Sequence, residues 1–451
     1  MLAGMEKIVH IIGAGLAGSE AALQLAHRGV QVRLHEMRPV VSTDVHKTDQ
    51  CAELVCSNSL KSTKPDSAAG MLKRELTCMG SYLLQEAYET HVDAGGALAV
   101  DRDVFAEHIT NAIKNHENIE YIVGEVQDPT ELRDADAIIL ASGPLTSDAL
   151  AEWIQTVTGS ENMAFFDAAA PIVMADSLNM DILFRQSRYE QDAIGDYLNA
   201  AFDKEQYDMF IDELLGADRV VKKDFETREL FQACQPIEEI ARKGHDAPRF
   251  GTLKPVGLID PATNRRPWAA LQLRAENNEH TAYNLVGFQT NLTFPEQRRV
   301  FRMIPGLEEA EFARYGVMHR NTFIQAPVLL DEHLRLQVDS QTPLYVAGQL
   351  AGTEGYCEAI ASGLMCALQV YAALEDIKMP SMPKETAFGS LLAYATNPET
   401  MDYQPMHVNF GIIAPLDTHI RNKRQRYEAY AERGKVALDQ YCDTLTHKGI
   451  L

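Results

Sequence analysis

The chain contains 451 residues, of which 46% are hydrophobic and 23% are charged, as in ordinary globular proteins. This composition excludes a disordered chain, a collagen-like repeat and a small disulfide-stabilised scaffold. Its 41 basic and 64 acidic residues give a net charge of −23, which argues against non-specific coating of nucleic acid or binding to an anionic membrane. A local basic patch remains compatible with this total, because charges act over a Debye length of roughly 8 Å at physiological salt. At about 150 residues per domain, the length predicts two or three domains.

The cysteines and the first residues of the chain indicate a reducing compartment. Seven cysteines, an odd number, follow no regular spacing, and the first residues lack the basic and apolar regions of a secretory leader. No run of 18 apolar residues predicts a membrane span. We therefore expect a cytoplasmic protein with reduced thiols and no membrane partner. No CxxC pair or HExxH motif occurs, so the sequence predicts no dedicated metal site.

The first predicted unit is a βαβ motif over residues 8–36. A β-branched run at 8–12 precedes the glycine-rich turn GAGLAG at 13–18. Apolar residues at helical spacing then continue to Gly29, and a second strand is predicted at 30–36. A strand, a glycine turn, a helix and a strand within about 30 residues predict a parallel sheet.

The turn has the GxGxxG spacing of a dinucleotide-binding fingerprint. In that fingerprint the first glycine allows the tight turn, the second lets a pyrophosphate approach the backbone, and the third lets the helix pack on the strand. Glu36 ends the second strand 18 residues after the last glycine, where an acid can accept hydrogen bonds from a ribose. A structural glycine turn is the alternative, but the flanking strand, helix and acid all favour dinucleotide binding. The predicted cofactor-binding residues of this unit are Gly13, Ala14, Gly15, Leu16, Ala17, Gly18 and Glu36.

Two later segments favour FAD among the dinucleotides. FAD enzymes of the glutathione-reductase type add a strand ending in an A-[TS]-G turn, and a second strand whose terminal acid holds the ribityl chain. ASGP at 141–144 fits the first pattern, and TPLYVAGQ at 342–349 fits the second except that Gln349 replaces the acid. Gly348 and Gln349 are therefore predicted at the cofactor, followed by a glycine-rich helix start at 352–363. A flexible loop before a core helix is the alternative for this region.

The middle of the chain interrupts the predicted sheet. Strands are expected at 137–142 and 344–348 and a helix at 358–374, whereas 185–230 shows helical spacing and 253–294 shows short strands with turns. The predicted fold class is α/β, a glutathione-reductase-like Rossmann FAD-binding domain with an inserted α+β domain. We expect the FAD-binding domain at 1–145 and 326–451, where it ends in a C-terminal tail, and the insertion at 146–325.

Two cysteines lie in unusual surroundings. Cys56 lies in AELVCSNSLKS at 52–62, where polar side chains could activate a thiol, although a small buried residue in a turn is the alternative. Cys234 precedes a predicted helix that begins near Pro236, and a helix N-terminus stabilises a thiolate. The acidic residues in the first turn of that helix oppose the effect. The residues alone therefore leave Cys234 open between a nucleophile and a structural cysteine.

Long blocks of the chain, beyond these motifs, resemble one family, the folate- and flavin-dependent tRNA (uracil-5)-methyltransferases called TrmFO. The blocks include the glycine-rich start, AELVCSNSLKS, AGGALAVDR, CQPIEEIARKG, RYGVMHRNTFI and GTEGYCEAIASGL, and they extend from about residue 8 to about residue 411. The blocks around Cys56, Cys234 and Tyr356 are more specific than the glycine fingerprint. A related tRNA flavoprotein that modifies the wobble uridine shares the FAD domain but is longer.

The resemblance implies an activity and a set of roles. Members methylate C5 of uridine 54 in the T-loop of tRNA, take the one-carbon unit from 5,10-methylenetetrahydrofolate, and use FAD that NAD(P)H reduces. Cys234 matches the proposed nucleophile, which adds to C6 of uracil. Cys56 matches a second catalytic cysteine near the flavin, and Tyr356 matches an aromatic residue near the flavin ring. The division of labour between the two cysteines stays open.

An RNA substrate requires a local basic surface despite the acidic total. The candidates for RNA contact are Lys61, Arg265, Arg266, Arg298 and Arg299, with Lys64, Lys73, Arg74 and the RNKRQR segment at 421–426 as further basic positions. For each of them, an ordinary solvated side chain is the alternative. The same chemistry on ribosomal RNA and a non-methylating flavin-containing RNA-binding protein are alternative functions. A small-molecule flavin oxidoreductase is disfavoured, because no second GxGxxG for NAD(P)H is evident.

Overall fold

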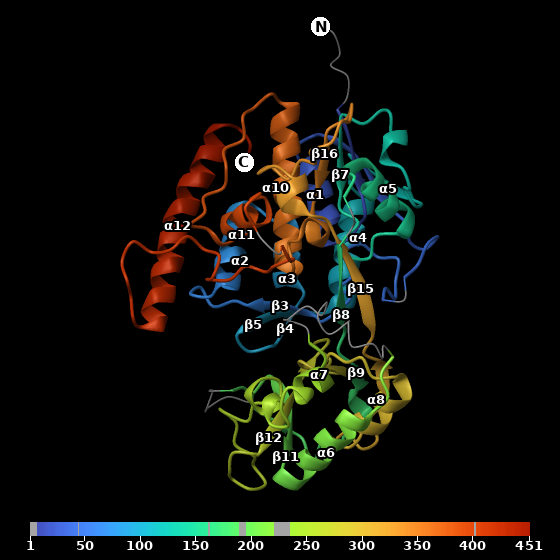
Figure 1. Ribbon diagram of the computed structural model, residues 1–451, viewed down its shortest axis with the longest axis vertical. Coiled ribbons are helices and arrows are strands. Elements are labelled where there is room, and N and C mark those ends of the chain that lie inside the picture. The colour runs from blue at the N-terminus through green and yellow to red at the C-terminus, as the bar shows by residue number, and fades with distance from the viewer. Residues whose placement is uncertain (1–6, 44, 161–162, 189–194, 221–234, 401–402) are drawn as a thin grey trace.

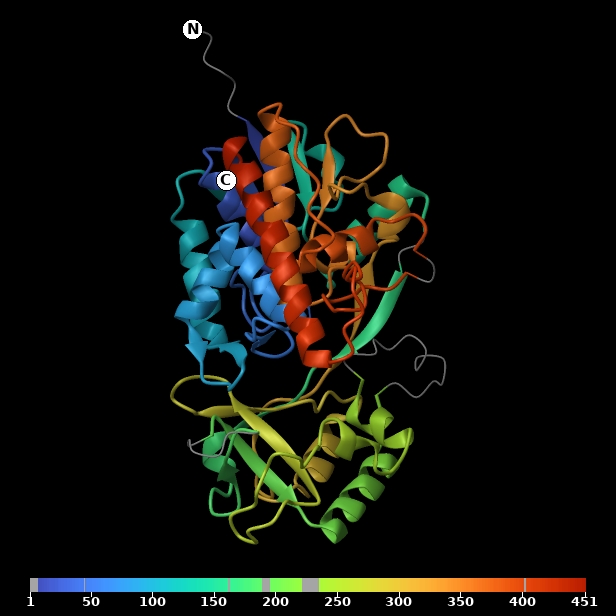
Figure 2. The same ribbon diagram turned by 90° about the vertical axis from the view of Figure 1, so that its left-hand side faces the viewer.

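The computed structural model describes residues 7–43, 45–160, 163–188, 195–220, 235–400 and 403–451. Two lobes are visible in Figures 1 and 2, one above the other and joined by extended strands. The larger lobe combines the blue N-terminal segments with the orange and red C-terminal segments, and the smaller lobe holds the green and yellow middle of the chain. The chain therefore leaves the larger lobe and returns to it.

A five-stranded parallel sheet forms the centre of the larger lobe, in the order β16-β7-β1-β2-β6. Its strands are β1 (Ile8–Ile12), β2 (Gln31–Glu36), β6 (Ile119–Val123), β7 (Ala137–Leu140) and β16 (Leu344–Val346). Aliphatic residues such as Ile11, Leu34 and Ile139 are fully buried, as expected for a parallel sheet covered on both faces. In the register, Ile11 lies opposite both Leu34 and Ile139, so these strands end at the same edge. This sheet confirms the predicted α/β Rossmann-type fold.

Helices α1 (Leu16–Ala26) and α10 (Tyr356–Leu374) pack closely against each other. Small residues permit this approach, because a Cβ at Gly363 would overlap the backbone of Ala17. By length and composition α10 could cross a membrane, with a mean hydropathy of 1.5, but 83% of that window is buried inside the protein. The helix predicted at 358–374 is therefore a core helix of the larger lobe, and it begins two residues earlier.

Further helices and a small antiparallel sheet, β3-β5-β4, complete the larger lobe. In Figure 1 this small sheet lies at the edge that faces the smaller lobe. The elements are β3 (Ser59–Ser62), α2 (Ala68–Cys78), α3 (Tyr82–Glu89), β4 (His91–Val92), β5 (Ala97–Val100), α4 (Arg102–Lys114), α5 (Asp148–Thr158), α9 (Ala326–Leu329), α11 (Ala387–Ala395) and α12 (Lys423–His447). Side chains that accept hydrogen bonds from the first helical N–H groups cap α2, α3 and α4, namely Ser67, Ser81 and Asp101.

A six-stranded antiparallel sheet organises the smaller lobe, in the order β10-β11-β12-β13-β9-β14. Phe202, Phe210, Phe288 and Phe301 lie in its separate hydrophobic core. The elements are β9 (Ile172–Met174), β10 (Phe184–Arg185), β11 (Tyr197–Phe202), α6 (Lys204–Gly216), α7 (Ile237–Arg242), β12 (Ala269–Ala275), β13 (Ala282–Leu285), α8 (Phe294–Phe301) and β14 (Phe312–Arg314). Two antiparallel strands, β8 (Met163–Ala168) and β15 (Met318–Phe323), run between the lobes in Figure 1.

The helical interpretation of 185–230 is wrong for part of that segment. Residues 204–216 form α6, but residues 197–202 form the strand β11, which pairs along its whole length with β12. A strand in the middle of a sheet gains ladder hydrogen bonds and buries both faces, and this tertiary context overrides the spacing of its side chains.

One buried carboxyl group predicts a pH dependence of stability. Glu75 of α2 accepts hydrogen bonds from the N–H groups of Ala387 and Phe388, at 2.6 and 2.8 Å. Burial raises the pKa of Glu75 to about 7, although these bonds favour its charged form. Because this folded-state pKa lies above the unfolded value, the folded protein binds the proton more tightly, and stability is lost as pH rises from about 4.5 to about 7.

We expect the free energy of unfolding to fall by about 2–3 kcal/mol over that range. In the Glu75→Gln variant, the free energy of unfolding should change much less with pH. Urea unfolding of both proteins at about pH 5 and about pH 8 measures the difference. An unchanged pH dependence in the variant would assign the effect to other groups.

Candidate functional site

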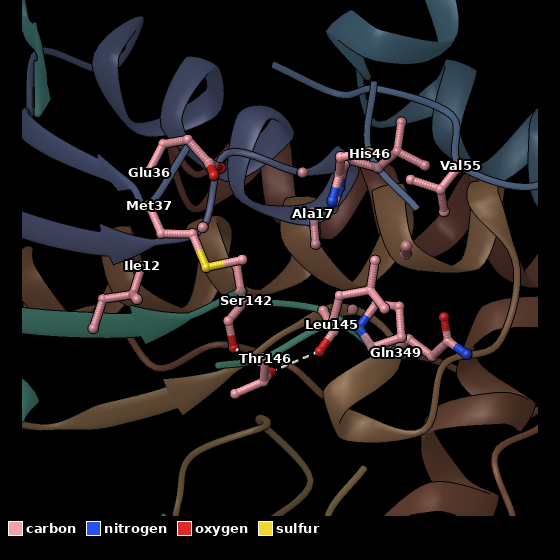
Figure 3. Close-up of a pocket in the computed structure, with 18 of the residues that line it drawn as sticks. Ile12, Ala17, Glu36, Met37, His46, Val55, Ser142, Leu145, Thr146 and Gln349 are labelled. Carbon is pink, nitrogen blue, oxygen red and sulfur yellow. Dashed lines mark hydrogen bonds between the residues drawn. The ribbon is translucent and has the colours of Figure 1, made fainter. Parts of the chain in front are cut away.

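A large cavity opens at the carboxyl ends of the parallel strands, the edge at which open α/β sheets bind ligands. The space between its lining residues, open solvent at its mouth included, amounts to about 1220 Å³. Figure 3 shows Glu36 and Gln349 on opposite sides of this space. Of the predicted residues, those that line it are Gly13, Gly15, Leu16, Ala17, Glu36, Cys56, Gly348, Gln349 and Tyr356.

The turn between β1 and α1 places its three glycines in three different environments. Gly13 has a φ of +103°, and a Cβ there would lie 2.6 Å from the Ala141 carbonyl oxygen. A Cβ at Gly18 would overlap the carbonyl oxygen of Gly13. At Gly15, the N-cap of α1, a Cβ would meet no atom of the described residues within 4 Å. Gly13 and Gly18 therefore serve the fold, whereas Gly15 leaves room for an anion beside the N–H groups at the start of the helix.

Glu36 at the end of β2 is buried and held in place. One carboxylate oxygen accepts the Ala14 N–H at 2.9 Å, and the other accepts the backbone N–H and Nε of Arg38, at 3.0 and 2.9 Å. Burial opposes ionisation of Glu36, but the bonds and charge of Arg38 outweigh it and lower the pKa of the carboxyl. A carboxylate has about four acceptor positions, so an ionised Glu36 that accepts three bonds can still bind a ribose hydroxyl.

Cys56 and Tyr356 meet at another part of the cavity wall, although 300 residues separate them in the chain. The Cys56 backbone N–H donates to the Tyr356 hydroxyl oxygen at 2.9 Å. Burial raises the pKa of Tyr356, so its hydroxyl keeps its proton. The fold therefore places a thiol and a neutral phenol beside the same ligand space.

The turn after β16 contains a carboxylate, but not at position 349, where the sequence pattern of FAD enzymes predicts an acid. The side-chain amide of Gln349 donates to Glu354, and both residues line the cavity. The N–H of Gly348 donates to Ser362 Oγ of α10 at 2.6 Å, which fixes the turn on that helix. An acid expected at position 349 is thus present five residues later, next to Gln349.

Several cavity residues carried no sequence signal that we recognised. Arg38, which forms ion pairs with Glu36 and Glu53 at 2.9 and 3.2 Å, is one of them. Burial and the charge of Arg38 lower the pKa of His46 to about 4, so the cavity wall holds a neutral imidazole there. The position of Arg38 two residues after a strand-ending acid was the one available hint.

The catalytic cysteine predicted at position 234 lies outside the described residues. Among the described residues, no group of three or more His, Cys, Asp or Glu side chains is arranged to hold a metal ion.

The predicted RNA-contact residues lie in different settings. Arg265 and Arg266 are exposed and directly follow a turn at 261–264 in the smaller lobe. Arg298 donates to the Tyr315 hydroxyl at 2.8 Å, whereas Arg299 forms ion pairs with Glu296 and Glu213.

Two lysines of the larger lobe also differ from one another. The ammonium of Lys61, a predicted RNA contact, lies 3.2 Å from the buried Glu358 carboxylate, and its own side chain is partly exposed. The expectation of a surface position for Lys73 is wrong. This lysine is 2% exposed, and its ammonium donates to the carbonyls of Leu60 and Ser62, at 2.5 and 3.1 Å. These bonds stabilise the backbone before α2, and the ammonium of Lys73 is not available to RNA.

Cys78 provides a control for the two cysteines that the sequence predicts to be catalytic. Its sulfur lies 2.7 Å from the sulfur of Cys442, at the contact of α2 with α12 and away from the cavity lining. Cys78 is exposed, so we expect Cys78→Ala to change the free energy of unfolding by about 1 kcal/mol at most and to leave flavin content and turnover unchanged. Denaturant unfolding and a turnover assay test this. Lost turnover in a stably folded variant would contradict a purely structural role.

Comparisons with known proteins agree with this geometry. The family described as "GIDA: Glucose inhibited division protein A" matches residues 8–378. A solved structure of GidA from Aquifex aeolicus superposes with a TM-score of 0.68 at 15% identity, and covers 99% of this chain and 75% of that chain. The fold and the cavity thus define a Rossmann-type FAD-binding protein of the GidA type.

Relatives at higher identity show which family within this class the chain belongs to. The protein named "Methylenetetrahydrofolate--tRNA-(uracil-5-)-methyltransferase TrmFO" from Symbiobacterium thermophilum is 49% identical to this chain, over 95% of this chain and 95% of the relative. The relative in Geobacter sulfurreducens is also 49% identical, over 98% of this chain and 100% of its own length. The chain belongs to the TrmFO family.

Proposed function

We propose that this protein methylates C5 of a uridine in tRNA, with 5,10-methylenetetrahydrofolate as one-carbon donor and FAD as cofactor. The cavity carries the proposal. Its glycine turn and Glu36 fit the pyrophosphate and ribose of FAD, and its wall also holds Cys56 and Tyr356. Relatives named for this reaction are 49% identical over 95–98% of the chain.

The mechanism that we propose uses both predicted cysteines. Uracil C5 is a poor nucleophile until a thiolate adds to C6, which makes C5 an enolate carbon that can attack the one-carbon unit. We assign this addition to Cys234 and a role in acid–base chemistry on the flavin side to Cys56. Bound FAD, reduced by NAD(P)H, supplies the electrons that convert the methylene into a methyl group. Tyr356 holds the Cys56 backbone through its hydroxyl.

The substrate we infer is uridine 54 in the T-loop of tRNA. A base inside a folded arm has to leave its stack to reach a buried site. The exposed Arg265 and Arg266 are our candidates for phosphate contacts from the smaller lobe. We place the enzyme in the cytoplasm, where its thiols stay reduced.

An isotope experiment tests the proposed reaction. Purified protein is incubated with unmodified tRNA, NADPH and folate labelled in its methylene group. We expect labelled 5-methyluridine, and no label transfer from S-adenosylmethionine in a parallel reaction. A tRNA with cytidine at position 54 is the matched control and should stay unmodified, and a ribosomal RNA fragment tests the alternative substrate. Label that arrives only from S-adenosylmethionine would end the proposal.

A further inference from the structure

The segment that carries Cys56 belongs to no regular element. Residues 54–58 form neither a helix nor a strand, so no ladder of backbone hydrogen bonds fixes the position of this cavity-lining cysteine. Buried carbonyl groups outside regular structure need other donors. In this segment, arginine side chains provide them.

Arg102, the first residue of α4, contacts the backbone around Cys56. Its guanidinium donates to the Leu54 carbonyl at 2.8 Å and approaches the Cys56 carbonyl at 3.4 and 3.5 Å. Its Nε donates to a carboxylate oxygen of Glu276 at 2.8 Å, and the two side chains are only 11% and 9% exposed. Glu276 follows β12 of the smaller lobe directly. One buried ion pair therefore connects the smaller lobe to the backbone of Cys56.

The smaller lobe holds the same segment at two more points. Arg274 Nε donates to the Asn58 side-chain oxygen at 2.8 Å, and the Asn58 amide donates to the Ala275 carbonyl at 3.1 Å. Arg314 of β14 donates to the Val55 carbonyl at 2.6 Å. The residues on both sides of Cys56 are thus bonded to the smaller lobe, while the thiol lines a cavity of the larger one.

We propose that Arg102 is a positioning residue for methyl transfer: through its ion pair with Glu276, it fixes the Cys56 backbone and couples the cysteine to the smaller lobe. The proposal rests on the function assigned to Cys56 above. A planar guanidinium suits this task, because it can bond a carboxylate and backbone carbonyls at fixed angles, whereas a lysine ammonium acts as a point charge. A misplacement of about 1 Å at a reacting group can cost about 100-fold in rate.

The test compares variants of the intact flavoprotein. We expect Arg102→Met to lower kcat at least about tenfold, with the KM for tRNA changed less than about threefold and with normal flavin content. Arg102→Lys should recover part of the loss. Arg33→Met is the matched control. This arginine pairs with Glu120 at 2.9 Å and lies outside the cavity lining, so kcat should not change.

Glu276→Gln keeps the size of the side chain and removes its charge, so it tests the coupling even if Arg102→Met folds poorly. We expect Glu276→Gln to lower kcat as well, and the double variant with Arg102→Lys to lose less than the product of the two single losses. A normal kcat in Glu276→Gln would overturn the proposal. A loss in kcat of the double variant equal to the product of the two single losses would overturn it as well. An active Cys56→Ala protein would instead reject the role of Cys56. An inactive Cys56→Ala protein beside a fully active Arg102→Met protein would reject only the positioning role.

Discussion

Replacement of Cys234 by alanine is expected to abolish a covalent protein–RNA adduct that the wild-type protein forms with T-arm RNA containing 5-fluorouracil. Addition of a thiolate to C6 activates C5, and completion of the cycle then requires loss of the C5 proton. Fluorine cannot leave as a proton does, so the thiol stays bonded to the base. A labelled RNA that migrates with the protein on a denaturing gel measures the adduct. The Cys234→Ala protein should still bind FAD, because position 234 lies outside the predicted cofactor-binding segments.

Cys56→Ala supplies the comparison that separates the two thiols. We expect its turnover to fall by about 100-fold or more, the range for loss of an acid–base group, while some capacity to form the adduct remains. Normal turnover and adduct formation in Cys78→Ala would show that the effects do not follow from removal of any cysteine. An adduct that persists in Cys234→Ala but disappears in Cys56→Ala would reverse the two assignments.

The Gly15→Val variant is expected to purify without flavin but with an intact fold. The backbone at Gly15 has a φ of −73°, which any residue can adopt, and a Cβ there meets no atom within 4 Å in the part of the chain that the structure describes. The added side chain instead fills the space that a pyrophosphate needs at the start of α1. The ratio of flavin absorbance to protein absorbance measures occupancy, and far-UV circular dichroism reports the fold.

Gly216→Val is the matched control for this variant. A Cβ at Gly216 also meets no described atom within 4 Å, but Gly216 ends α6 in the smaller lobe and does not line the cavity. This control should bind flavin normally. A yellow Gly15→Val protein with full occupancy would mean that the turn does not hold the pyrophosphate.

Local sequence signals predicted the parts of the fold that depend on neighbours in the chain. The βαβ unit at 8–36 could be recognised because strand, turn and helix follow one another, and its three glycines have separable physical reasons. The strand at 344–346 and the helix at 356–374 were also recognisable from short apolar runs beside glycines.

Contacts between distant segments could not be predicted in the same way. The bond between Cys56 and Tyr356 joins positions 300 residues apart, and the Arg102–Glu276 pair joins the two lobes. Neither periodicity nor spacing records which loops will face each other after packing. The misinterpreted strand at 197–202 has the same origin, because its partner β12 begins 67 residues later in the chain. The Arg38 ion pair was missed since one arginine near an acid is common in any sequence.

The place of β16 in the central sheet has a consequence during protein synthesis. β16 is the parallel neighbour of β7, but about 200 residues separate Leu140 from Leu344. At about 5–20 residues per second, the ribosome needs about 10–40 s to make that stretch. Until then the edge of β7 has no partner, and an unpaired strand edge can recruit other chains. We therefore expect chaperone binding and aggregation to compete with folding during the period when β7 has been made and β16 has not.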